Sequence, residues 1–380
     1  MSSPSVSHIL DSIAAAGTAH RNGEAGSRET LIDLGLQLVS SLEIPSEFIQ
    51  RTMWAEPARS AHCRLALDRQ IFQHLRDAGD AGISAVSLAE KTGLDVPLLQ
   101  RVLRHLVAMY MVSYTDGKFH ATALSNGLAK ENYQQSIAFC YDVSRPSFNN
   151  LPEYLKQTGY KNPLNPTDGA FQAAHKSKLP FFDWLVANPP HLSEFDSFMS
   201  AYRAGKANWY DPNFYPVAER LIGAFDPSNS DVLLVDVGGG RGHDLLEYSA
   251  RHPSSPGRLI LQDREPVIAS VQGKENMPFE AMAHDFYTPQ PIKAARAYLL
   301  HSILHDWDDN DGVLLNEIVL SEEHPTLAAT SMDMMMLAHL GVRERTEADW
   351  RAILARAGLK VVYIYSYPGV EESLIEAELE

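Results

Sequence analysis

Two patterns of hydrophobic residues divide the chain into two parts. From Glu29 to about residue 225, apolar residues recur mainly at the three- and four-residue spacing of amphipathic helices. After Asp226, short apolar runs alternate with helical segments, which is typical of a parallel sheet covered by helices. The pattern predicts a flexible lead over residues 1–27, a helical domain over residues 28–225 and an α/β domain over residues 226–380.

The second half contains seven apolar runs that predict strands. They cover residues 232–237, 258–263, 279–286, 295–304, 313–320, 359–367 and 373–380. Pro368-Gly369 joins the last two as a hairpin, so one closing strand should be antiparallel in a mostly parallel sheet. The predicted fold class is therefore α/β, with a C-terminal Rossmann-like domain preceded by a mainly α domain.

Residues 82–129 have the pattern of a winged helix. Two helical segments, 83–93 and 96–112, precede a hairpin that turns at Asp116-Gly117. Such motifs often bind DNA, so a non-catalytic regulator is one alternative. The second helix is too apolar for that role, and acidic residues outnumber basic ones 48 to 32, giving a formal charge of −16. The charge argues against a nucleic-acid partner.

Composition restricts the remaining classes. The two cysteines, Cys63 and Cys140, form neither a disulfide framework nor a zinc site, so no metal is expected. No apolar run is long enough to span a membrane, and a cytoplasmic enzyme without a membrane partner is the expectation. Apolar residues between Leu31 and Leu75 exceed what one small domain needs. They predict a homodimer through the N-terminal helices, with packing inside one chain as the alternative.

Aromatic residues are dense between Phe139 and Tyr215. Many of them suit a hydrophobic core. The same density, next to a catalytic domain, also suits a pocket for a flat apolar ligand. Both interpretations stay open for each residue at this stage.

A glycine-rich turn follows the first predicted strand of the α/β domain. Residues 238–242 read Gly-Gly-Gly-Arg-Gly, at the carboxyl end of the strand, where open α/β sheets bind ligands. Asp263 ends the next strand, in position to bind a ribose. Asp236 precedes the turn and suits a sulfonium cation better than a pyrophosphate. These residues favour S-adenosylmethionine over a dinucleotide.

Several motifs together resemble a known family. They are residues 232–242, Asp263, 284–287, 301–309, 314–320, 332–350 and 375–380. The chain resembles the class I O-methyltransferases of the plant phenolic and fungal polyketide type, and is most similar to the fungal members. The resemblance implies S-adenosylmethionine as cofactor and a small aromatic or polyketide hydroxyl as acceptor.

The same resemblance implies roles for individual cofactor residues. Gly238, Gly239 and Gly240 would line the methionine and adenosine, and Asp263 would bind the ribose. Asp285 and Phe286 would frame the adenine. His301 stands where the family usually has a longer basic side chain, so it departs from the pattern.

His305 is the candidate general base. It follows a predicted strand at the same sheet edge as the glycine turn, and its reference pKa of about 6.5 suits removal of a phenolic proton. The family pattern places Asp333 and Glu344 beside it as supporting acids. The alternative within the family is a pericyclase that keeps S-adenosylmethionine as a fixed charge. The intact His305, Asp333 and Glu344 favour methyl transfer.

One connection departs from the expected topology. Parallel neighbours need a crossover of about a dozen residues or more, usually a helix. Only eight residues separate Leu304 from Val313. The sequence therefore predicts either that the helix is lost or that a segment near Gly312 is missing from the written sequence, and we favour the second.

Overall fold

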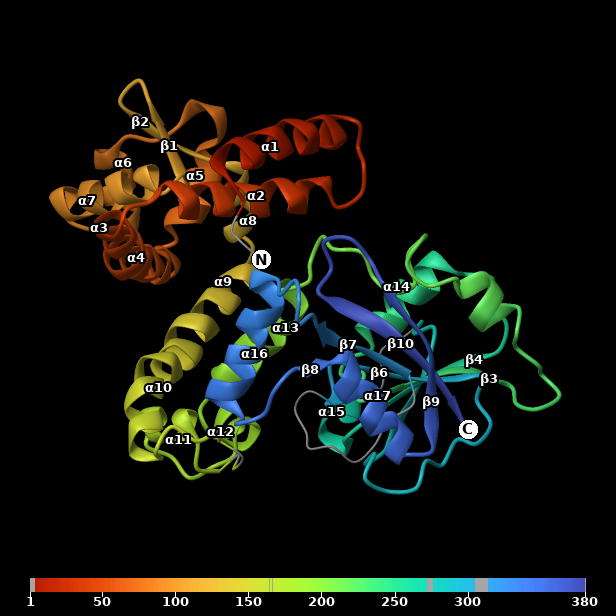
Figure 1. Cartoon of the computed structure of the whole chain (residues 1–380). Coiled ribbons are helices and arrows are strands. Elements are labelled where there is room, and N and C mark those ends of the chain that lie inside the picture. Colours follow the sequence, from red (N-terminus) through yellow and green to blue (C-terminus); the bar gives the residue numbers. More distant parts are fainter. Residues whose placement is uncertain (1–3, 164, 166, 272–275, 305–313, 380) are drawn as a thin grey trace. The chain divides into compact units, whose positions relative to one another are not determined.

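The computed structural model describes residues 4–163, 165, 167–271, 276–304 and 314–379. The chain divides into two compact units (Figure 1). The first comprises Met1–Ala15, Ile32–Gly205 and Ala338–Gly341, and the second comprises Ala16–Leu31, Lys206–Leu337 and Val342–Glu380. The predicted domain boundaries at residues 27 and 225 stay predictions.

The first unit is mainly helical. Helices α1 (Val6–Arg21) and α2 (Ser27–Leu42) have residues in both units. The remaining helices are α3 (Pro45–Ile49), η1 (Gln50–Ala55), α4 (Glu56–Asp68), α5 (Ile71–Ala78), η2 (Gly79–Ala81), α6 (Ala85–Thr92), α7 (Val96–Ala108), α8 (Ala123–Leu128), α9 (Glu131–Ala138), η3 (Phe139–Ser144), α10 (Arg145–Gln157), α11 (Ala170–His175), α12 (Phe181–Ala187) and α13 (His191–Ala201).

Local sequence explains the two helices and the hairpin predicted over residues 82–129. The Ser84 hydroxyl caps α6 by accepting a hydrogen bond from the Ser87 N–H, and Gly93 ends this helix at a φ of 68°. The Asp95 carboxylate caps α7 in the same way. Strands β1 (Val112–Thr115) and β2 (Lys118–Ala121) then pair antiparallel around the Asp116-Gly117 turn. The apolar face of α7 is buried in the core of this region.

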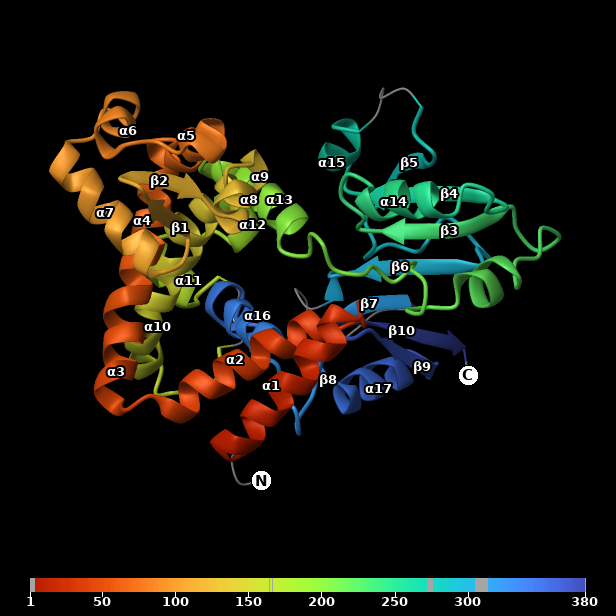
Figure 2. The ribbon, with the colours of Figure 1, turned by 90° about the horizontal axis from the view of Figure 1, so that it is seen from above.

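The second unit is built on one sheet. Its strand order is β5-β4-β3-β6-β7-β10-β9, with β8 beside β7 (Figure 2). The strands are β3 (Val232–Val237), β4 (Arg258–Asp263), β5 (Glu280–Ala283), β6 (Ala297–His301), β7 (Leu314–Leu320), β8 (Arg345–Thr346), β9 (Leu359–Ser366) and β10 (Glu372–Leu379). The helices of this unit are α14 (His243–Arg251), α15 (Glu265–Ala269) and α17 (Glu347–Arg356), together with η4 (Ala218–Ile222) and most of α16 (Leu327–His339).

The observed sheet confirms the predicted α/β class and its antiparallel closing strand. β3 is buried along its whole length, as expected for a central strand covered on both faces. β10 runs antiparallel to both β7 and β9. β6 ends earlier than the predicted run of residues 295–304, because Ser302 adopts a φ of 52° and leaves the extended conformation.

The connection between β6 and β7 is the one that departs from the family pattern. The two strands are parallel neighbours, with Leu300 opposite Leu315. Of the linking residues 302–313, those from 305 onward lie outside the described residues. The predicted loss or omission of a helical crossover near Gly312 falls on this part and stays a prediction.

Among the described residues, none of the helices has the length and apolar character needed to cross a bilayer. The cytoplasmic location stays a prediction.

Candidate active site

The glycine turn lies between β3 and α14. Gly238, Gly240 and Gly242 have φ values of 76°, 59° and 78°, a region that favours glycine. The N–H groups of Gly238 and Gly239 donate to the Gln262 carbonyl at 2.7 and 3.2 Å. The Gly240 N–H donates to the Asp263 carboxylate at 2.8 Å. The turn is therefore tied to the end of the neighbouring strand β4.

Three of these glycines, Gly238, Gly239 and Gly242, also have no room for a side chain. A Cβ atom on Gly239 would overlap the Asp236 carboxylate, and one on Gly238 would lie 2.7 Å from the Ile303 Cδ1 atom. Nothing lies within 4 Å of the Cβ position of Gly240. The turn is thus packed against its own strand ends on one side and has open space at Gly240.

Asp236 is completely buried beneath this turn. Neither of its carboxylate oxygens has a hydrogen-bond partner among the described residues. Burial raises the pKa of Asp236 well above its usual range, and the carboxylate of Asp244 adds to the effect. A buried carboxyl group without a partner is costly, so a ligand that brings a cation or a hydrogen-bond donor to this point would be stabilised.

His301, a predicted cofactor residue, lies between two acids. Its Nδ1 is 2.5 Å from the Asp244 Oδ2 and its Nε2 is 3.2 Å from the Glu372 Oε2. The Asn316 amide donates to the same Glu372 oxygen at 3.3 Å. We call Asp236, Asp244, His301, Asn316 and Glu372 the strand-end cluster. The sequence argument missed Asp244, Asn316 and Glu372, which come from α14, β7 and β10.

The other predicted cofactor residues follow β4 and β5. The Asp263 carboxylate accepts from the N–H groups of Gly240 and Arg264, and burial raises its pKa although these hydrogen bonds oppose the shift. Asp285 is exposed, and its carboxylate accepts from the Tyr287 N–H at 3.1 Å. Phe286 is half-buried beside Tyr287. Asp263 is thus joined directly to the glycine turn, whereas Asp285 and Phe286 shape the segment after β5.

The predicted base, His305, lies outside the described residues, but the segment leading to it is well defined. The N–H groups of Ile303 and Leu304 both donate to the Glu317 Oε1, at 2.9 and 2.7 Å. Arg345 donates to the Leu304 carbonyl at 2.6 Å. We call Ile303 and Leu304 the stem. Two buried charged side chains hold the stem directly before His305.

The two predicted acids are joined to each other. The Asp333 Oδ1 accepts from the backbone N–H of Glu344 at 2.9 Å. Glu344 is buried, and its neighbour Arg345 places its guanidinium 5.1 Å from the centre of the Trp350 ring. Asp333 thus contacts the backbone of Glu344, the residue directly before the arginine that holds the stem.

Glu317 and Arg345 are site residues that the sequence argument did not single out. A signal was present for Glu317, because Asn316-Glu317 interrupts an otherwise apolar strand. A charged residue in a buried strand needs a partner, and the stem N–H groups supply it.

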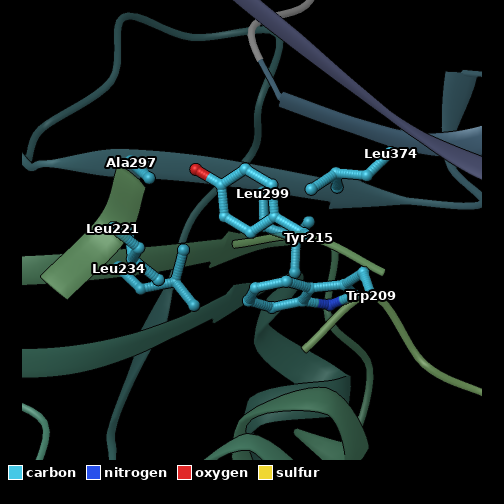
Figure 3. A pocket seen from close by; sticks show the side chains of 7 residues that line it. All are labelled: Trp209, Tyr215, Leu221, Leu234, Ala297, Leu299 and Leu374. Atoms are coloured by element: carbon cyan, nitrogen blue, oxygen red, sulfur yellow. The ribbon is translucent and has the colours of Figure 1, made fainter. Parts of the chain in front are cut away.

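The aromatic residues between Phe139 and Tyr215 are divided between the two units. Phe139, Phe171 and Phe181 are buried in the first unit, whereas Trp209 and Tyr215 are buried in the second. Trp209 and Tyr215 line a small cavity with Leu221, Leu234, Ala297, Leu299 and Leu374 (Figure 3). None of these cavity residues is a predicted site residue, so for Trp209 and Tyr215 the core interpretation is favoured.

A mostly parallel sheet, a glycine turn after one strand and an acid after its neighbour define a Rossmann-like enzyme with an adenosine-type cofactor. The O-methyltransferase domain family matches residues 215–360. O-methyltransferase mpaG of Penicillium brevicompactum is 57% identical, with all of both chains covered. The chain belongs to the O-methyltransferase family, the class that the motifs predicted, with S-adenosylmethionine as the methyl donor.

Solved structures support the fold. The LepI complex with SAM has a TM-score of 0.87 and 26% identity, and covers 99% of this chain and 100% of that one. A structure described as "A Pericyclic Reaction enzyme" has a TM-score of 0.87 and 26% identity, with coverages of 98% and 100%.

The alignment with mpaG also bears on chain length. It extends over 397 positions, 17 more than the 380 residues of this chain. At least 17 aligned positions of the relative therefore have no counterpart here.

Proposed function

We propose that this O-methyltransferase moves the methyl group of S-adenosylmethionine to a hydroxyl of a small aromatic or polyketide-type metabolite, with His305 as general base. One observation carries the proposal. Ile303 packs against Gly238 of the glycine turn, and the stem that contains it ends one residue before His305. The described backbone directly before the proposed base is thus held beside the turn.

The residues around the turn fit this cofactor. When bound, it supplies a methyl group activated by a positive sulfonium. Gly238, Gly239 and Gly240 would allow close backbone approach, and Asp263 would bind the ribose. The buried Asp236 carboxyl lacks a partner among the described residues, which suits a positively charged ligand better than a phosphate.

His301, Asp285 and Phe286 complete the proposed cofactor set. His301 is held by Asp244 and Glu372, so its ring orientation is fixed before any ligand arrives. Asp285 and Phe286, after β5, would frame the adenine. A single histidine with two acid partners takes the place of the longer basic side chain usual in the family.

The chemical step needs a base because a neutral phenol has a pKa of about 10. His305 would take the hydroxyl proton as the oxygen attacks the methyl carbon, a contribution typically worth about 10²–10⁴-fold. Asp333 and Glu344 would support the resulting imidazolium. Glu317 and Arg345 would act as positioning residues, since both hold the stem rather than the acceptor.

The N-terminal helices offer a surface for a second copy of the chain. Ile32, Leu36 and Val39 lie at helical spacing on α2 and are each more than 40% exposed. Such an apolar face is unfavourable in water, and we propose that it forms the homodimer interface. The substitution Leu36→Glu should convert a dimer to a monomer in analytical ultracentrifugation, with Asp33→Glu as a matched control. A wild-type monomer would contradict the dimer.

A pericyclase is the second candidate, because one structural neighbour carries that description. The two functions differ in one product. Incubation with methyl-labelled S-adenosylmethionine and a panel of phenols should give labelled product and an equal amount of S-adenosylhomocysteine. A pericyclase would consume its substrate and leave the cofactor unchanged, and that result would overturn the proposal.

A further inference from the structure

Gln262, the residue before Asp263 in β4, is paired through its side chain with Gln290. Each side-chain amide donates to the carbonyl oxygen of the other, and both N–O distances are 2.8 Å. Gln262 is completely buried and Gln290 is half-buried. We call these two residues the glutamine pair. Because two directional bonds join the same two groups, they restrict the orientation of Gln290 as well as its distance from β4.

The backbone of Gln262 holds the glycine turn at the same time. Its carbonyl accepts from the N–H groups of Gly238 and Gly239, at 2.7 and 3.2 Å. In the sheet, β4 lies between β3 and β5 (Figure 2). One residue therefore contacts the turn after β3 with its main chain and the segment after β5 with its side chain, and all of these contacts lie within the second unit.

The segment after β5, residues 285–292, contains both proposed adenine residues and is anchored at its end. The Gln290 Oε1 also accepts from the backbone N–H of Ile292, at 3.1 Å. The Ile292 carbonyl accepts from the hydroxyl of Tyr298, a residue of β6, at 2.8 Å. The segment is thus tied to β4 and β6, the two neighbours of β3.

The chemistry of the glutamine pair favours a role in placement over a role in stability. Buried amides lose their hydrogen bonds to water, so a bonded pair gives little net stability compared with two apolar side chains of the same shape. Apolar contacts have no preferred direction, whereas hydrogen bonds do. The pair therefore supplies a defined geometry that apolar packing at this position would not.

We propose that the glutamine pair positions the segment after β5 for the cofactor: it holds Asp285 and Phe286 at a fixed place relative to the glycine turn, so that one adenosyl group contacts both. This rests on the adenine role proposed above for Asp285 and Phe286. Gln262 and Gln290 act as positioning residues, because they hold backbone segments and not the ligand. The alternative is that the pair only fills the space beside β4.

The test replaces both amides together. The double substitution Gln262→Met with Gln290→Met supplies apolar side chains of similar shape, so the fold should persist. Calorimetry on the full chain, with S-adenosylhomocysteine as the probe, should show about 10-fold weaker binding, as expected when two positioning hydrogen bonds are lost. Hydrogen exchange should be faster at the Ile292 amide, which loses its acceptor. A pair that only fills space would leave the affinity unchanged.

Two further variants control for stability. Gln172→Met removes a buried, hydrogen-bonded glutamine of the first unit and should bind the probe as the wild type does. Gln290→Glu keeps an acceptor for Gln262 and for the Ile292 N–H and loses one donor, so its affinity should lie between the wild type and the double variant. Wild-type affinity in the double variant, or in Gln290→Glu if the double variant does not fold, overturns the proposal. An equal loss in Gln172→Met overturns it as well.

The failures of the two proposals are distinguishable, because the binding test needs no methyl transfer. If the double variant binds the probe weakly but the wild type methylates no phenol, methyl transfer is wrong and the positioning role stands. If the wild type methylates phenols and the double variant keeps its affinity, only the positioning role is wrong. Asp285→Ala should also weaken binding of the probe. Wild-type affinity in that variant would mean that the segment does not hold the cofactor, and would overturn the positioning role.

Discussion

The strand-end cluster and a second group of side chains each enclose a histidine, in opposite surroundings. The second group is the rings of Phe139, Phe148, Phe171 and Phe181 around His339, which we call the phenylalanine cage. His301 has a carboxylate within 3.2 Å of each ring nitrogen, whereas His339 has phenyl rings on its sides and an Nε2 without a partner among the described residues. The first arrangement suits a positively charged ligand. The second is the surrounding of a neutral histidine in a hydrophobic core. The chemical behaviour of each histidine is therefore determined by the side chains that surround it, and not by the residue type alone.

The strand-end cluster and the phenylalanine cage also differ in their contribution to the stability of the fold. Buried carboxyl groups such as Asp236 and Glu372 oppose folding unless a partner satisfies them. The packed rings of the cage contribute to folding through burial and aromatic contacts. We therefore expect substitutions in and around the strand-end cluster to change activity at little cost in stability, and substitutions in the cage walls to cost stability first.

The largest expected effect comes from His305, four residues after His301 of the strand-end cluster in the sequence. His305→Ala should lower turnover by at least about 100-fold, because the acceptor would then lose its proton without a positioned base. Affinity for S-adenosylmethionine, measured by calorimetry, should stay unchanged. His324→Ala removes an exposed histidine of the same unit and should behave as the wild type. Equal turnover in both variants would remove His305 from the mechanism.

A substitution at Gly239 tests whether the glycine turn binds the cofactor. Gly239→Ala places a methyl group on the buried Asp236 carboxylate, so the turn or this carboxylate must shift. Overpacking of this kind costs about 1–3 kcal/mol, which corresponds to roughly 5- to 150-fold weaker cofactor binding if the shift moves the turn from its ligand. Gly127→Ala, which like Gly239 has no positive φ but has open space at its Cβ position, is the matched control. Cofactor affinity equal to wild type would mean that the turn does not hold the ligand.

The sequence predicted the parts of the site that depend on local order. A glycine turn after a strand and an acid at the end of the next strand are close in the chain, and their geometry follows from the α/β repeat. The turn at Pro368-Gly369 also joins segments that are close in the sequence, and it correctly predicted an antiparallel strand.

Contacts between distant segments could not be predicted in the same way. His301 meets Asp244 and Glu372 across 57 and 71 residues. Arg345 reaches the Leu304 carbonyl across 41 residues. These contacts depend on which strands become neighbours in the sheet, and periodicity carries no such information. The sequence argument therefore chose Asp333 and Glu344 but missed Glu317 and Arg345.

A substitution at Glu317 tests whether the hydrogen bonds that hold the stem contribute to turnover. Glu317→Gln keeps an oxygen acceptor but removes the charge that strengthens both hydrogen bonds from the stem. A loss of about 1 kcal/mol in positioning the base corresponds to roughly 5-fold lower kcat. The KM for S-adenosylmethionine should stay constant, because a positioning residue does not touch the cofactor. Glu322→Gln, an exposed neighbour, should have no effect. A raised KM with unchanged kcat would contradict the positioning role.

The smallest effect is expected from the cage, and it tests whether the cage contributes only to stability. Phe171→Leu keeps an apolar side chain in a fully buried position but loses ring contacts with Phe181 and Trp184. It should lower the free energy of unfolding by about 1 kcal/mol in a denaturant titration followed by tryptophan fluorescence.

Phe72→Leu, buried in the core around α5, should cost about the same free energy of unfolding. Because both phenylalanines pack in hydrophobic cores, both variants should keep the wild-type turnover at a temperature where they are fully folded. A lower turnover in Phe171→Leu alone, at an equal loss of stability, would contradict a purely packing role for the cage, whose residues, taken singly, are those of an ordinary core.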